Sequence, residues 1–446
     1  MNQNDSLNDE QQLALDKIMN GESIFITGPG GSGKSYLLEA LQKEFKRVGK
    51  EIAITALTGC AALLLGTNAK TLHSWAGIGL GKDNVDTIIS SIVMNGRKKK
   101  AWLKTDCLVI DEVSMMTPQL LEVLDCVGRR VRKTRDKPMG GLQVVLVGDF
   151  YQLPPVSNGK CQFAFESPVW NQLIKETICL KTIYRQSDEI FQKILGEART
   201  GTLSEESLQI LRNRMNLPWK KEIIRPTLLF TRNADVDTIN KSHFDKLEGE
   251  CKKYEVRTLV PTKATPGTLD GFLKTYNSVN IDLTPQEIQW QVERLDKDAP
   301  YEKEISLKVG AQVMLLTNLN QEAGLINGSR GVVKGFNSEG LPVVMFGSIN
   351  YTVPIKLHSW KAHGDVQIIR EQIPLRLAYA LTIHKAQGAS LDSAFIDIGS
   401  STFEYGQAYV ALSRVRNLNS LYVYDLDPKA FRVHPAVKEF YEKLPV

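Results

Sequence analysis

The sequence predicts an α/β fold that contains two parallel sheets. Short apolar runs that suit buried strands alternate with helix-like segments in two parts of the chain, and strands that alternate with helices pair in parallel. The stretch between these parts has a different composition and predicts a small inserted β domain. The expected strands are residues 23–27, 52–55, 107–110 and 142–147 in the first part, and 227–230, 377–382, 394–398 and 421–425 in the second.

The elements of the first part follow in order along the chain. Residues 23–27 form an apolar run that ends in glycines, and the helix after this strand is expected over 37–48. A second helix is expected between the strands 107–110 and 142–147, because apolar residues recur there at spacings of four and three. Those residues are Leu120, Leu124, Val127 and Val131.

The inserted domain is expected over about residues 258–372, within the second α/β domain. This stretch is rich in Pro, Thr, Gly and Asn, and its apolar runs are short, which is typical of a small β domain. The runs are residues 312–316, 331–333, 342–346 and 350–355.

Composition limits the class of protein. The 446 residues suffice for roughly two to four domains, and 42% hydrophobic with 24% charged residues is ordinary for a soluble globular protein. The net charge of +5 permits a polyanionic partner without requiring one. The six cysteines lack C-x-x-C spacing, which argues against a zinc or disulfide framework and predicts an intracellular compartment. The polar N-terminus predicts no targeting signal, and no apolar run approaches the roughly 18 residues of a membrane span.

The segment Gly28–Ser35 matches the phosphate-binding pattern G-x-x-x-x-G-K-[ST]. Its glycines let backbone N–H groups turn toward phosphate oxygens, Lys34 can reach the β- and γ-phosphates, and the Ser35 hydroxyl can ligate Mg²⁺. The expected strand before the loop and helix after it also favour an anion site. A chance match has a probability of roughly a few per cent in such a chain. The predicted loop consists of Gly28, Pro29, Gly30, Gly31, Ser32, Gly33, Lys34 and Ser35.

An acidic pair follows the expected strand 107–110. Asp111 can hold Mg²⁺, and Glu112 can orient and deprotonate an attacking water. A solvated acidic pair at a strand end is the alternative, but the phosphate-binding loop upstream makes it the weaker one. The pair therefore predicts hydrolysis of a nucleoside triphosphate.

The segment Gly148–Pro155 follows the expected strand 142–147. Because strand ends of one parallel sheet lie together, Gln152 can sense the γ-phosphate and transmit its state to a neighbouring surface. The residues alone also allow a simpler interpretation, in which Pro154 and Pro155 form a rigid turn.

Longer motifs resemble one family. Gly148–Val156 (GDFYQLPPV) is similar to motif III of superfamily 1 helicases, and Asp111–Met115 (DEVSM) to motif II. Thr71–Gly79 (TLHSWAGIG) and Met139–Gln143 (MGGLQ) narrow the resemblance to the Pif-type (petite integration frequency) DNA helicases of the 1B branch, although Met139 stands where that family usually has an aromatic residue. Further similar segments are residues 326–333 (INGSRGVV), 377–392 (LAYALTIHKAQGASLD) and 406–414 (GQAYVALSR).

The resemblance implies an ATP-dependent DNA helicase that moves 5'-to-3' on single-stranded DNA and unwinds duplex, with ATP and Mg²⁺ as cofactors. It implies two RecA-like parallel-sheet motor domains, a small wedge inserted in the first and a small β-barrel-like insertion in the second. ATP bound between the motor domains closes their cleft, and hydrolysis reopens it. The expected division is 1–76 and 105–180 for motor domain 1A, 77–104 for the wedge 1B, 181–257 and 373–446 for motor domain 2A, and 258–372 for the insertion 2B.

The resemblance also assigns roles within the nucleotide site. Gln11 resembles the glutamine that reads adenine, and Gly388 belongs to the ATP-binding set. Arg185 and Arg414 resemble the arginine fingers of motifs IV and VI, which neutralise charge on the transferred phosphoryl group. Without the motifs, either arginine would more simply be a surface or ion-pair residue. The implied catalytic set is Lys34, Glu112, Gln152, Arg185 and Arg414, with Ser35 and Asp111 on the metal.

Contacts to DNA are expected from hydroxyls, histidines and backbone amides at strand ends, which suit phosphate. Trp75 can stack on a base, or it can be an ordinary core residue. His73 alone would be a structural histidine, but its place in the family's motif favours DNA. The expected contacts are Thr55, Thr58, Gly59, His73, Ser74, Trp75, Pro154, Thr231, Arg232, Thr382, His384, Lys385, Gln387 and Ser390.

Two basic runs have simpler explanations. Residues 97–100 lie in the expected wedge and can bind DNA phosphate, yet a solvated face is the better default. The basic residues between Arg129 and Arg135 lie opposite the apolar stripe of their helix, so most of them are expected to face solvent.

The expected partners are single-stranded DNA and duplex or forked DNA, with quadruplex DNA and a single-strand-binding protein as further candidates. We expect a monomer without membrane association, in the cytoplasm or nucleoid of a bacterium or in the host cell of a virus. Three alternatives remain open from the residues: a phosphate-loop kinase or GTPase, a non-catalytic nucleic-acid-binding protein, and a motor that acts on RNA.

Overall fold

The structure, a computed structural model, describes residues 6–65, 69–79, 84–156, 160–215, 217–218, 224–259, 284–297, 299, 301–320, 323–347, 351–361 and 368–444. Parts of the predicted wedge (80–83) and of the predicted insertion (260–283, 298, 300, 321–322, 348–350 and 362–367) lie outside the described residues. Within the described ranges, no helix is both long enough and apolar enough to cross a membrane.

The first sheet has six parallel strands in the order β3-β2-β4-β5-β1-β6. The four predicted strands of this part are confirmed as β1, β2, β4 and β5. The two edge strands are additional, because β3 has only two residues and β6 mixes polar with apolar side chains. The bounds are β1 Ile24–Thr27, β2 Ile52–Ala56, β3 Lys70–Thr71, β4 Cys107–Asp111, β5 Gln143–Val147 and β6 Glu176–Cys179.

Alternating side chains give this sheet an apolar core on each face. Ile24 and Ile26 face one core with helices α1 and α2, whereas Phe25 faces the other core with helix α7. The predicted helix over 37–48 begins earlier, at Lys34, because Gly33 supplies a left-handed N-cap (φ 83°) directly before it. The helices of this part are α1 Asp9–Met19, α2 Lys34–Arg47, α3 Gly59–Leu64, α4 Leu72–Ala76, α5 Val85–Met94, α6 Gly96–Lys104, α7 Pro118–Val131 and α8 Pro168–Leu173.

The second sheet has four parallel strands in the order β18-β7-β19-β20. The predicted strand 377–382 is wrong in part, because the Ala378 carbonyl accepts hydrogen bonds from the side chains of Gln312 (2.9 Å) and Thr227 (3.1 Å) and the chain changes sheet there. The bounds are β7 Thr227–Phe230, β18 Ala380–Thr382, β19 Ala394–Ile398 and β20 Leu421–Leu426, with helices α9 Glu189–Thr200, α10 Glu205–Arg212, α11 Asn233–Asp245, α13 Gln407–Leu412 and α14 Pro435–Glu442.

The inserted β region is larger than predicted at both ends. A five-stranded antiparallel sheet has the order β14-β13-β12-β11-β17, and its edge strand β17 follows residue 372. Two smaller sheets have the orders β15-β16-β9 and β10-β8, and β8 precedes residue 258. Helix α12 is an addition to the all-β expectation. The bounds are β8 Lys252–Glu255, β9 Arg257–Leu259, α12 Pro285–Lys297, β10 Glu304–Leu307, β11 Gln312–Leu315, β12 Arg330–Phe336, β13 Pro342–Phe346, β14 Thr352–Pro354, β15 His358–Lys361, β16 Ile369–Gln372 and β17 Leu375–Leu377.

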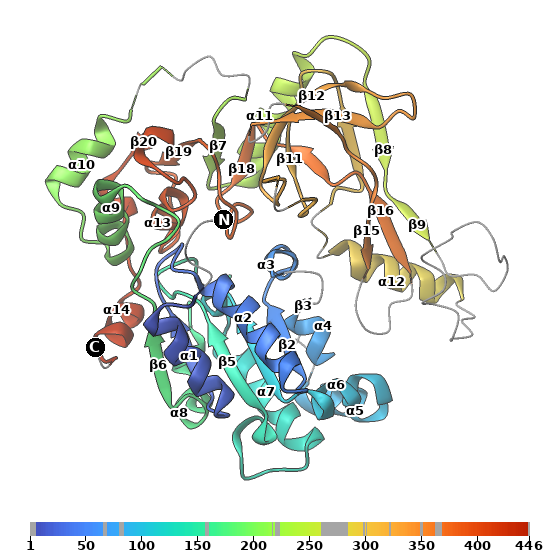
Figure 1. The fold of residues 1–446 in the computed structure, drawn as a ribbon, viewed down its shortest axis with the longest axis vertical. Helices are drawn as coiled ribbons and strands as arrows, with labels where there is room; N and C mark the ends of the chain where they lie inside the picture. Colours follow the sequence, from blue (N-terminus) through green and yellow to red (C-terminus); the bar gives the residue numbers. More distant parts are fainter. Residues whose placement is uncertain are drawn as a thin grey trace.

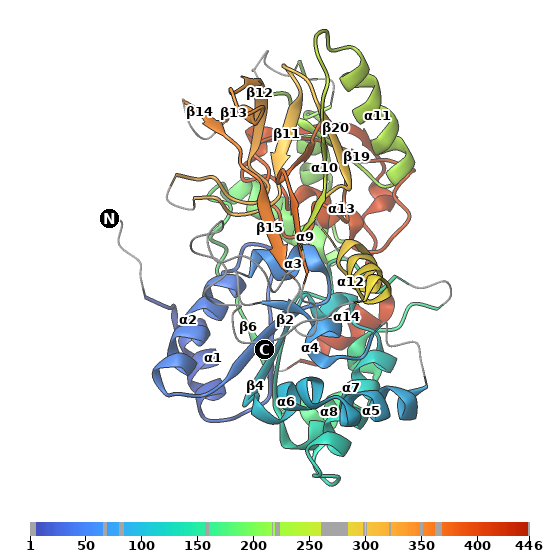
Figure 2. The same ribbon diagram turned by 90° about the vertical axis from the view of Figure 1, so that its right-hand side faces the viewer.

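Helices α5 and α6 lie at the edge of the first domain, where the wedge is expected (Figures 1 and 2). Trp102 of α6 is fully buried, and its ring lies 4.8 Å from that of Trp75. Arg132 of α7 donates to the Trp102 carbonyl at 2.6 Å, and Arg129 pairs with Asp125 at 2.7 Å. These two arginines are therefore structural, whereas Arg130, Lys133 and Arg135 are exposed, in line with the expectation that most of this run faces solvent.

The two α/β domains exchange segments where they meet. Leu153, in the loop after β5 of the first domain, is buried in the apolar core of the second. Conversely, α14 follows the last strand of the second domain but packs into the first, where the Phe440 ring stacks on Phe165 at 4.2 Å. In Figure 1, α14 accordingly lies beside the first domain near β6 and α8.

Close packing between α7 and the turn at Pro138–Gly141 generates a prediction for stability. A Cβ at Gly128 would lie 2.5 Å from the Met139 carbonyl oxygen, so we expect Gly128→Ala to lower the free energy of unfolding by about 2 kcal/mol. The helical residue Gly196 of α9 is the matched control, because a Cβ there meets nothing within 4 Å. We expect Gly196→Ala to be neutral or to stabilise by up to about 1 kcal/mol. Denaturant unfolding of both variants measures the difference, and equal effects would contradict the prediction.

Candidate functional site

Three neighbouring strands of the first sheet bring polar loops to one edge. Strands β4, β5 and β1 are adjacent and parallel, so their carboxyl ends lie together. The loop Gly28–Gly33 follows β1, Asp111 and Glu112 stand at the end of β4, and Gly148 opens the loop after β5. The three segments that the sequence singles out are therefore neighbours in space.

The loop after β1 is closely packed by other segments. Gly31 has φ 88°, and a Cβ there would lie 2.5 Å from Arg185 Cβ. At Gly33, a Cβ would lie 2.5 Å from Gln11 Nε2, which donates to the Gly33 carbonyl at 3.3 Å. Gln11 also closes the capping box of α1 with Asn8. The predicted adenine-reading residue thus lies against the phosphate-binding loop.

Lys34 lies folded against its own loop. Its ammonium donates to the carbonyls of Gly28 (2.7 Å) and Pro29 (2.9 Å), and more weakly to Ser32 Oγ (3.4 Å). Burial lowers the pKa of this lysine, and the charges of Asp149, Glu112 and Asp111 oppose that shift. Its ammonium is therefore a poorly solvated cation at the centre of the loop.

The acidic pair is held in an unusual backbone conformation. Glu112 has φ 56° and ψ 40°, a left-handed conformation that is uncommon for a residue with a side chain and that occurs often at functional sites. Burial, followed by the charge of Glu112, raises the pKa of Asp111 to about 7. Glu112 Oε2 accepts a hydrogen bond from Gln387 Nε2 of the second domain at 3.1 Å. The candidate general base is thus oriented from across the domain boundary.

A pocket of about 500 Å³ collects these residues with groups from the second domain. Eleven predicted nucleotide-site residues line it. Gly28, Pro29 and Ser32 bind the Lys34 ammonium, and Gln11 bonds to the Gly33 carbonyl. The lining also includes Tyr36, Ala61, Leu65, Tyr184 and Arg416, which no motif singled out, although Tyr184 and Arg416 each lie within two residues of a predicted arginine. The predicted members are Gly30, Gly31, Gly33, Lys34, Ser35, Asp111, Glu112, Gln152, Arg185, Gly388 and Arg414.

The two predicted arginine fingers lie close together in this pocket. Arg185 Nη1 donates to the Ser413 carbonyl at 3.4 Å, and Arg414 is buried with its guanidinium against the carbonyls of Val410, Ala386 and Ala389. Burial, followed by the charge of Arg185, lowers the pKa of Arg414 to about 9. Such a cluster of poorly solvated cations favours a highly charged anion as its ligand.

The oxygen donors of the pocket fit a hard divalent cation. The Ser35 hydroxyl and the Asp111 carboxylate line the same cavity, and Mg²⁺ prefers oxygen ligands from a few protein groups together with phosphate and water. These two residues would hold the ion, which would neutralise charge on the phosphates.

The sequence and the fold are both similar to those of known helicases. Residues 6–207 match the family of PIF1-like helicases, and residues 292–336 match the 2B domain of DNA helicase Pif1. The crystal structure of Pif1 helicase from Candida albicans is 32% identical, with a TM-score of 0.78 over 98% of this chain and 99% of that chain. The chain belongs to the PIF1-like helicase family.

Other PIF1-like helicases extend the comparison. A structure of two coordinating Pif1 helicases at forked double-stranded DNA is 28% identical, with a TM-score of 0.66 over 98% of this chain and 97% of that one. The ATP-dependent DNA helicase PIF1 of Xenopus laevis is 37% identical over 444 residues, which are 98% of this chain. This chain spans only 64% of the length of that relative. The family and its two RecA-like domains are thus confirmed.

Four residues expected to contact DNA lie elsewhere. Thr55 is fully buried and its hydroxyl donates to the Val109 carbonyl at 2.7 Å, so a sheet contact occupies this side chain. Trp75 is a core residue, and its ring packs at a tilt against that of Trp102. Gln387 bonds to Glu112, and Ser390 lines the pocket that holds Lys34. Both residues follow β18 and lie at the nucleotide pocket, and a DNA contact by either residue stays a prediction.

The remaining predicted DNA contacts differ in accessibility. Arg232 and Lys385 are exposed, whereas Thr58, Gly59, His73, Ser74 and His384 are partly buried. The Thr382 hydroxyl accepts from the Lys385 N–H at 3.3 Å, Pro154 is buried, and the buried Thr231 hydroxyl has no hydrogen-bond partner among the described residues.

The position of Gln387 allows a role in ATP hydrolysis to be distinguished from a role in DNA binding. Since its amide orients Glu112, we expect Gln387→Ala to slow ATP hydrolysis at saturating DNA by roughly 10-fold, below the full contribution of a positioned base. Its affinity for single-stranded DNA should change little. Lys385→Ala, an exposed neighbour, is the control and should weaken DNA binding at low salt without slowing hydrolysis. The opposite pattern in the two variants would restore the DNA-contact assignment of Gln387.

Proposed function

We propose that this protein is an ATP-dependent DNA helicase that moves 5'-to-3' on single-stranded DNA and unwinds duplex. The observation that carries the proposal is the shared pocket between two parallel-sheet domains. Lys34, Asp111 and Glu112 line it from the first domain, and Arg414 lines it from the second. A binding site divided in this way converts ligand binding into domain closure. Membership of the PIF1-like helicases supports DNA as the track.

In the proposed cycle, the chain's own residues prepare the γ-phosphate for attack by water. Lys34 leaves the carbonyls of Gly28 and Pro29 for phosphate oxygens, and Glu112 orients the water and accepts its proton. Gln152 contacts the γ-phosphate, while Arg185 and Arg414 neutralise the charge that develops in the transition state. A magnesium ion on Ser35 and Asp111 would add charge neutralisation. Loss of the phosphate releases the arginines and permits the cleft to open.

We propose the following division of labour along the chain. Residues 1–76 and 105–180 form motor domain 1A, and 77–104 form the wedge 1B that separates the strands. Residues 181–257 and 373–446, apart from the strands β8 and β17, form motor domain 2A, which carries the insertion 2B. The insertion is taken as 258–372 with the flanking strands β8 and β17, because both pair within its sheets.

The proposed DNA track runs over loops of both motor domains. It keeps the predicted residues that are exposed or partly buried and do not contact the nucleotide pocket or Glu112, and it adds Thr231, whose buried hydroxyl is unsatisfied within the described residues. Two domains that grip phosphates in alternation convert each cycle into a step along the strand. The proposed track residues are Thr58, Gly59, His73, Ser74, Thr231, Arg232, His384 and Lys385.

Further partners follow from the same proposal. A single copy is the proposed catalytic unit, since one chain supplies both sides of the pocket. Forked duplex is the proposed substrate, and two copies can share one fork, as the relative at forked DNA suggests. Quadruplex DNA and a single-strand-binding protein are additional candidate partners, in a bacterial nucleoid or a virus-infected cell.

The lysine of the phosphate-binding loop tests the ATPase. We expect Lys34→Ala to reduce DNA-stimulated ATP hydrolysis at least about 100-fold and to abolish unwinding, because the β- and γ-phosphates lose their main cation. Lys43→Ala is the matched control, since Lys43 is exposed on the same helix. Phosphate release measures both variants. Wild-type hydrolysis by Lys34→Ala would reject the assigned site.

Tailed duplexes test the polarity and the nucleic acid. We expect unwinding of a partial duplex with a 5' single-stranded DNA tail and none with a 3' tail, measured by separation of a labelled strand. Activity on 3' tails alone would reject the proposed direction. Equal activity with an RNA tail would favour the RNA-directed alternative.

A further inference from the structure

Two consecutive residues of the phosphate-binding loop bond to the two segments that carry the predicted arginine fingers. The Gly30 N–H donates to the Tyr409 hydroxyl of α13 at 2.8 Å. The Gly31 carbonyl accepts at 2.9 Å from the N–H of Tyr184, the residue directly before Arg185. These contacts attach both arginine-bearing segments to one turn of the loop.

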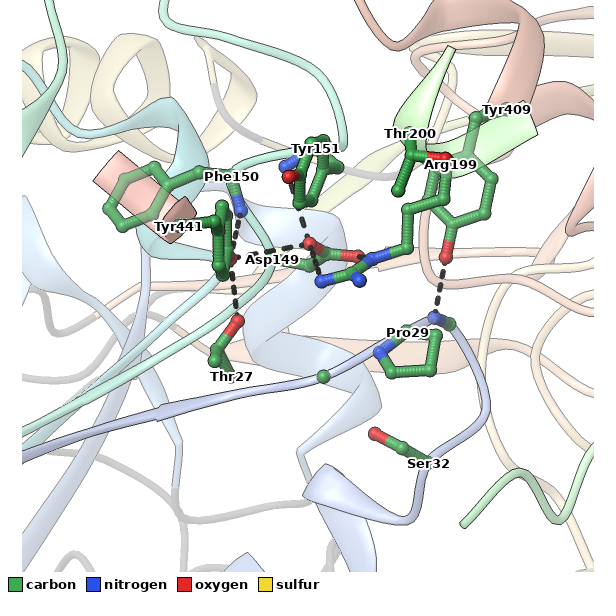
Figure 3. A network of polar contacts seen from close by, with 12 residues as sticks. Thr27, Pro29, Ser32, Asp149, Phe150, Tyr151, Arg199, Thr200, Tyr409 and Tyr441 are labelled. Carbon is green, nitrogen blue, oxygen red and sulfur yellow. Dashed lines mark hydrogen bonds and ion pairs between the residues drawn. The ribbon is translucent and has the colours of Figure 1, made fainter. Parts of the chain in front are cut away.

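The Tyr409 side chain belongs to the core of the second domain. Its exposed fraction is 2%, and it packs within the apolar cluster beneath the second sheet. Figure 3 shows its hydroxyl pointing at the loop beside Pro29. A Cβ at Gly30 would lie 3.7 Å from this hydroxyl oxygen and 3.6 Å from Ser413, so the loop and the end of α13 are in close contact. Because a closely packed ring moves with its core, the hydroxyl sets the place of α13 on the loop.

Arg414 follows α13 and is held on its last turn. Its Nε donates to the Val410 carbonyl at 2.9 Å, and its Nη2 donates to Ser413 Oγ at 2.6 Å. Ser413 Oγ donates to the same Val410 carbonyl at 2.9 Å, and the Ser413 N–H donates to the Tyr409 carbonyl at 2.9 Å. The guanidinium therefore moves with the turn that Tyr409 attaches to the loop.

A separate ion pair also joins the two domains in this region (Figure 3). Arg199 of α9 donates to the buried Asp149 carboxylate, from Nε at 3.0 Å and from Nη2 at 2.9 Å. Removal of the Tyr409 hydroxyl leaves both of these hydrogen bonds in place. The domains then stay attached, and the placement of α13 on the loop is what changes.

We propose that Tyr409 is a positioning residue for Arg414, and that Ser413 completes the connection. The Tyr409 hydroxyl places α13 on the phosphate-binding loop, and Ser413 holds the guanidinium on that helix. A cation that stabilises a transition state must be placed accurately, so a small displacement of the helix slows phosphoryl transfer more than it weakens binding of ATP. The inference rests on the proposed ATP site and on Arg414 as its finger.

The first test compares Tyr409→Phe with the wild-type full chain in DNA-stimulated ATP hydrolysis. We expect kcat to fall roughly 10-fold while KM for ATP changes less than about 2-fold, because the groups that bind the phosphates in the ground state remain. In an Arg414→Ala background, the same change should slow single-turnover hydrolysis less than about 2-fold, since no guanidinium is left to misplace. A purely structural role for Tyr409 predicts equal losses in both backgrounds.

Binding of a transition-state mimic gives a second measurement that needs no turnover. Methylanthraniloyl-labelled ADP is titrated with magnesium, alone and with aluminium fluoride, which imitates the transferred phosphoryl group. We expect Tyr409→Phe to weaken the aluminium fluoride complex roughly 10-fold and ADP alone less than about 2-fold. Tyr254→Phe is the matched control, because its hydroxyl donates to the Gly340 carbonyl at 2.6 Å within the insertion. Both affinities of this control should stay within about 2-fold of wild type.

Several results would overturn the inference. They are wild-type kcat in a folded Tyr409→Phe, equal losses with and without Arg414, and equal weakening of ADP and its aluminium fluoride complex. Wild-type hydrolysis by Arg414→Ala would overturn it as well. If denaturant unfolding shows that Tyr409→Phe does not fold, Ser413→Ala takes its place with the same expectations, and unchanged kcat in that variant overturns the inference. Absence of ATP hydrolysis by the wild type would instead reject the proposed function.

Discussion

The architecture of the site depends on one constraint, namely that β4, β5 and β1 are parallel neighbours and end at the same edge of a sheet. The backbone delivers a phosphate-binding loop, an acidic pair and a glutamine to one place, although they are far apart in sequence. The second sheet brings its own loops to the facing side, where Gln387 reaches Glu112 and Arg414 lines the pocket. Neither sheet alone lines the whole pocket, so the geometry of the pocket depends on how the two domains are placed.

The sequence predicts the strands and the phosphate-binding loop well, because both depend on local patterns: buried apolar runs and glycines that precede a helix. It predicts residues near a strand end less well in detail. Gln387 and Lys385 are two positions apart, yet Gln387 bonds to the Glu112 carboxylate whereas Lys385 is exposed to solvent. The motifs that contain Thr55 and Trp75 do not indicate whether these residues lie at the surface or in the core. Their contacts in the fold, with Val109 and Trp102 respectively, place both in the core. The edge strands and α12 lack a distinctive pattern, since tertiary contacts rather than propensity stabilise them.

Electrostatics in the pocket follow from burial more than from net charge. The chain carries a formal charge of only +5, yet Lys34, Arg185 and Arg414 all have lowered pKa values because each is shielded from water. Cations that have lost their hydration interact most favourably with a polyphosphate, whereas an exposed, hydrated lysine interacts with it only weakly. The buried Asp149 differs from these cations, because the guanidinium of Arg199 compensates its charge at 2.9 Å.

The return of α14 to the first domain also constrains how the chain folds. Val437 is a buried member of the core beneath the first sheet, Phe440 and Tyr441 pack against that core, and all three lie more than 250 residues after β6 by chain number. During synthesis from the N-terminus, that core stays incomplete until residues 437–441 have emerged. The first α/β domain must therefore leave part of its aromatic core uncovered until α14 has been made, so completion of this core depends on residues that follow the second sheet.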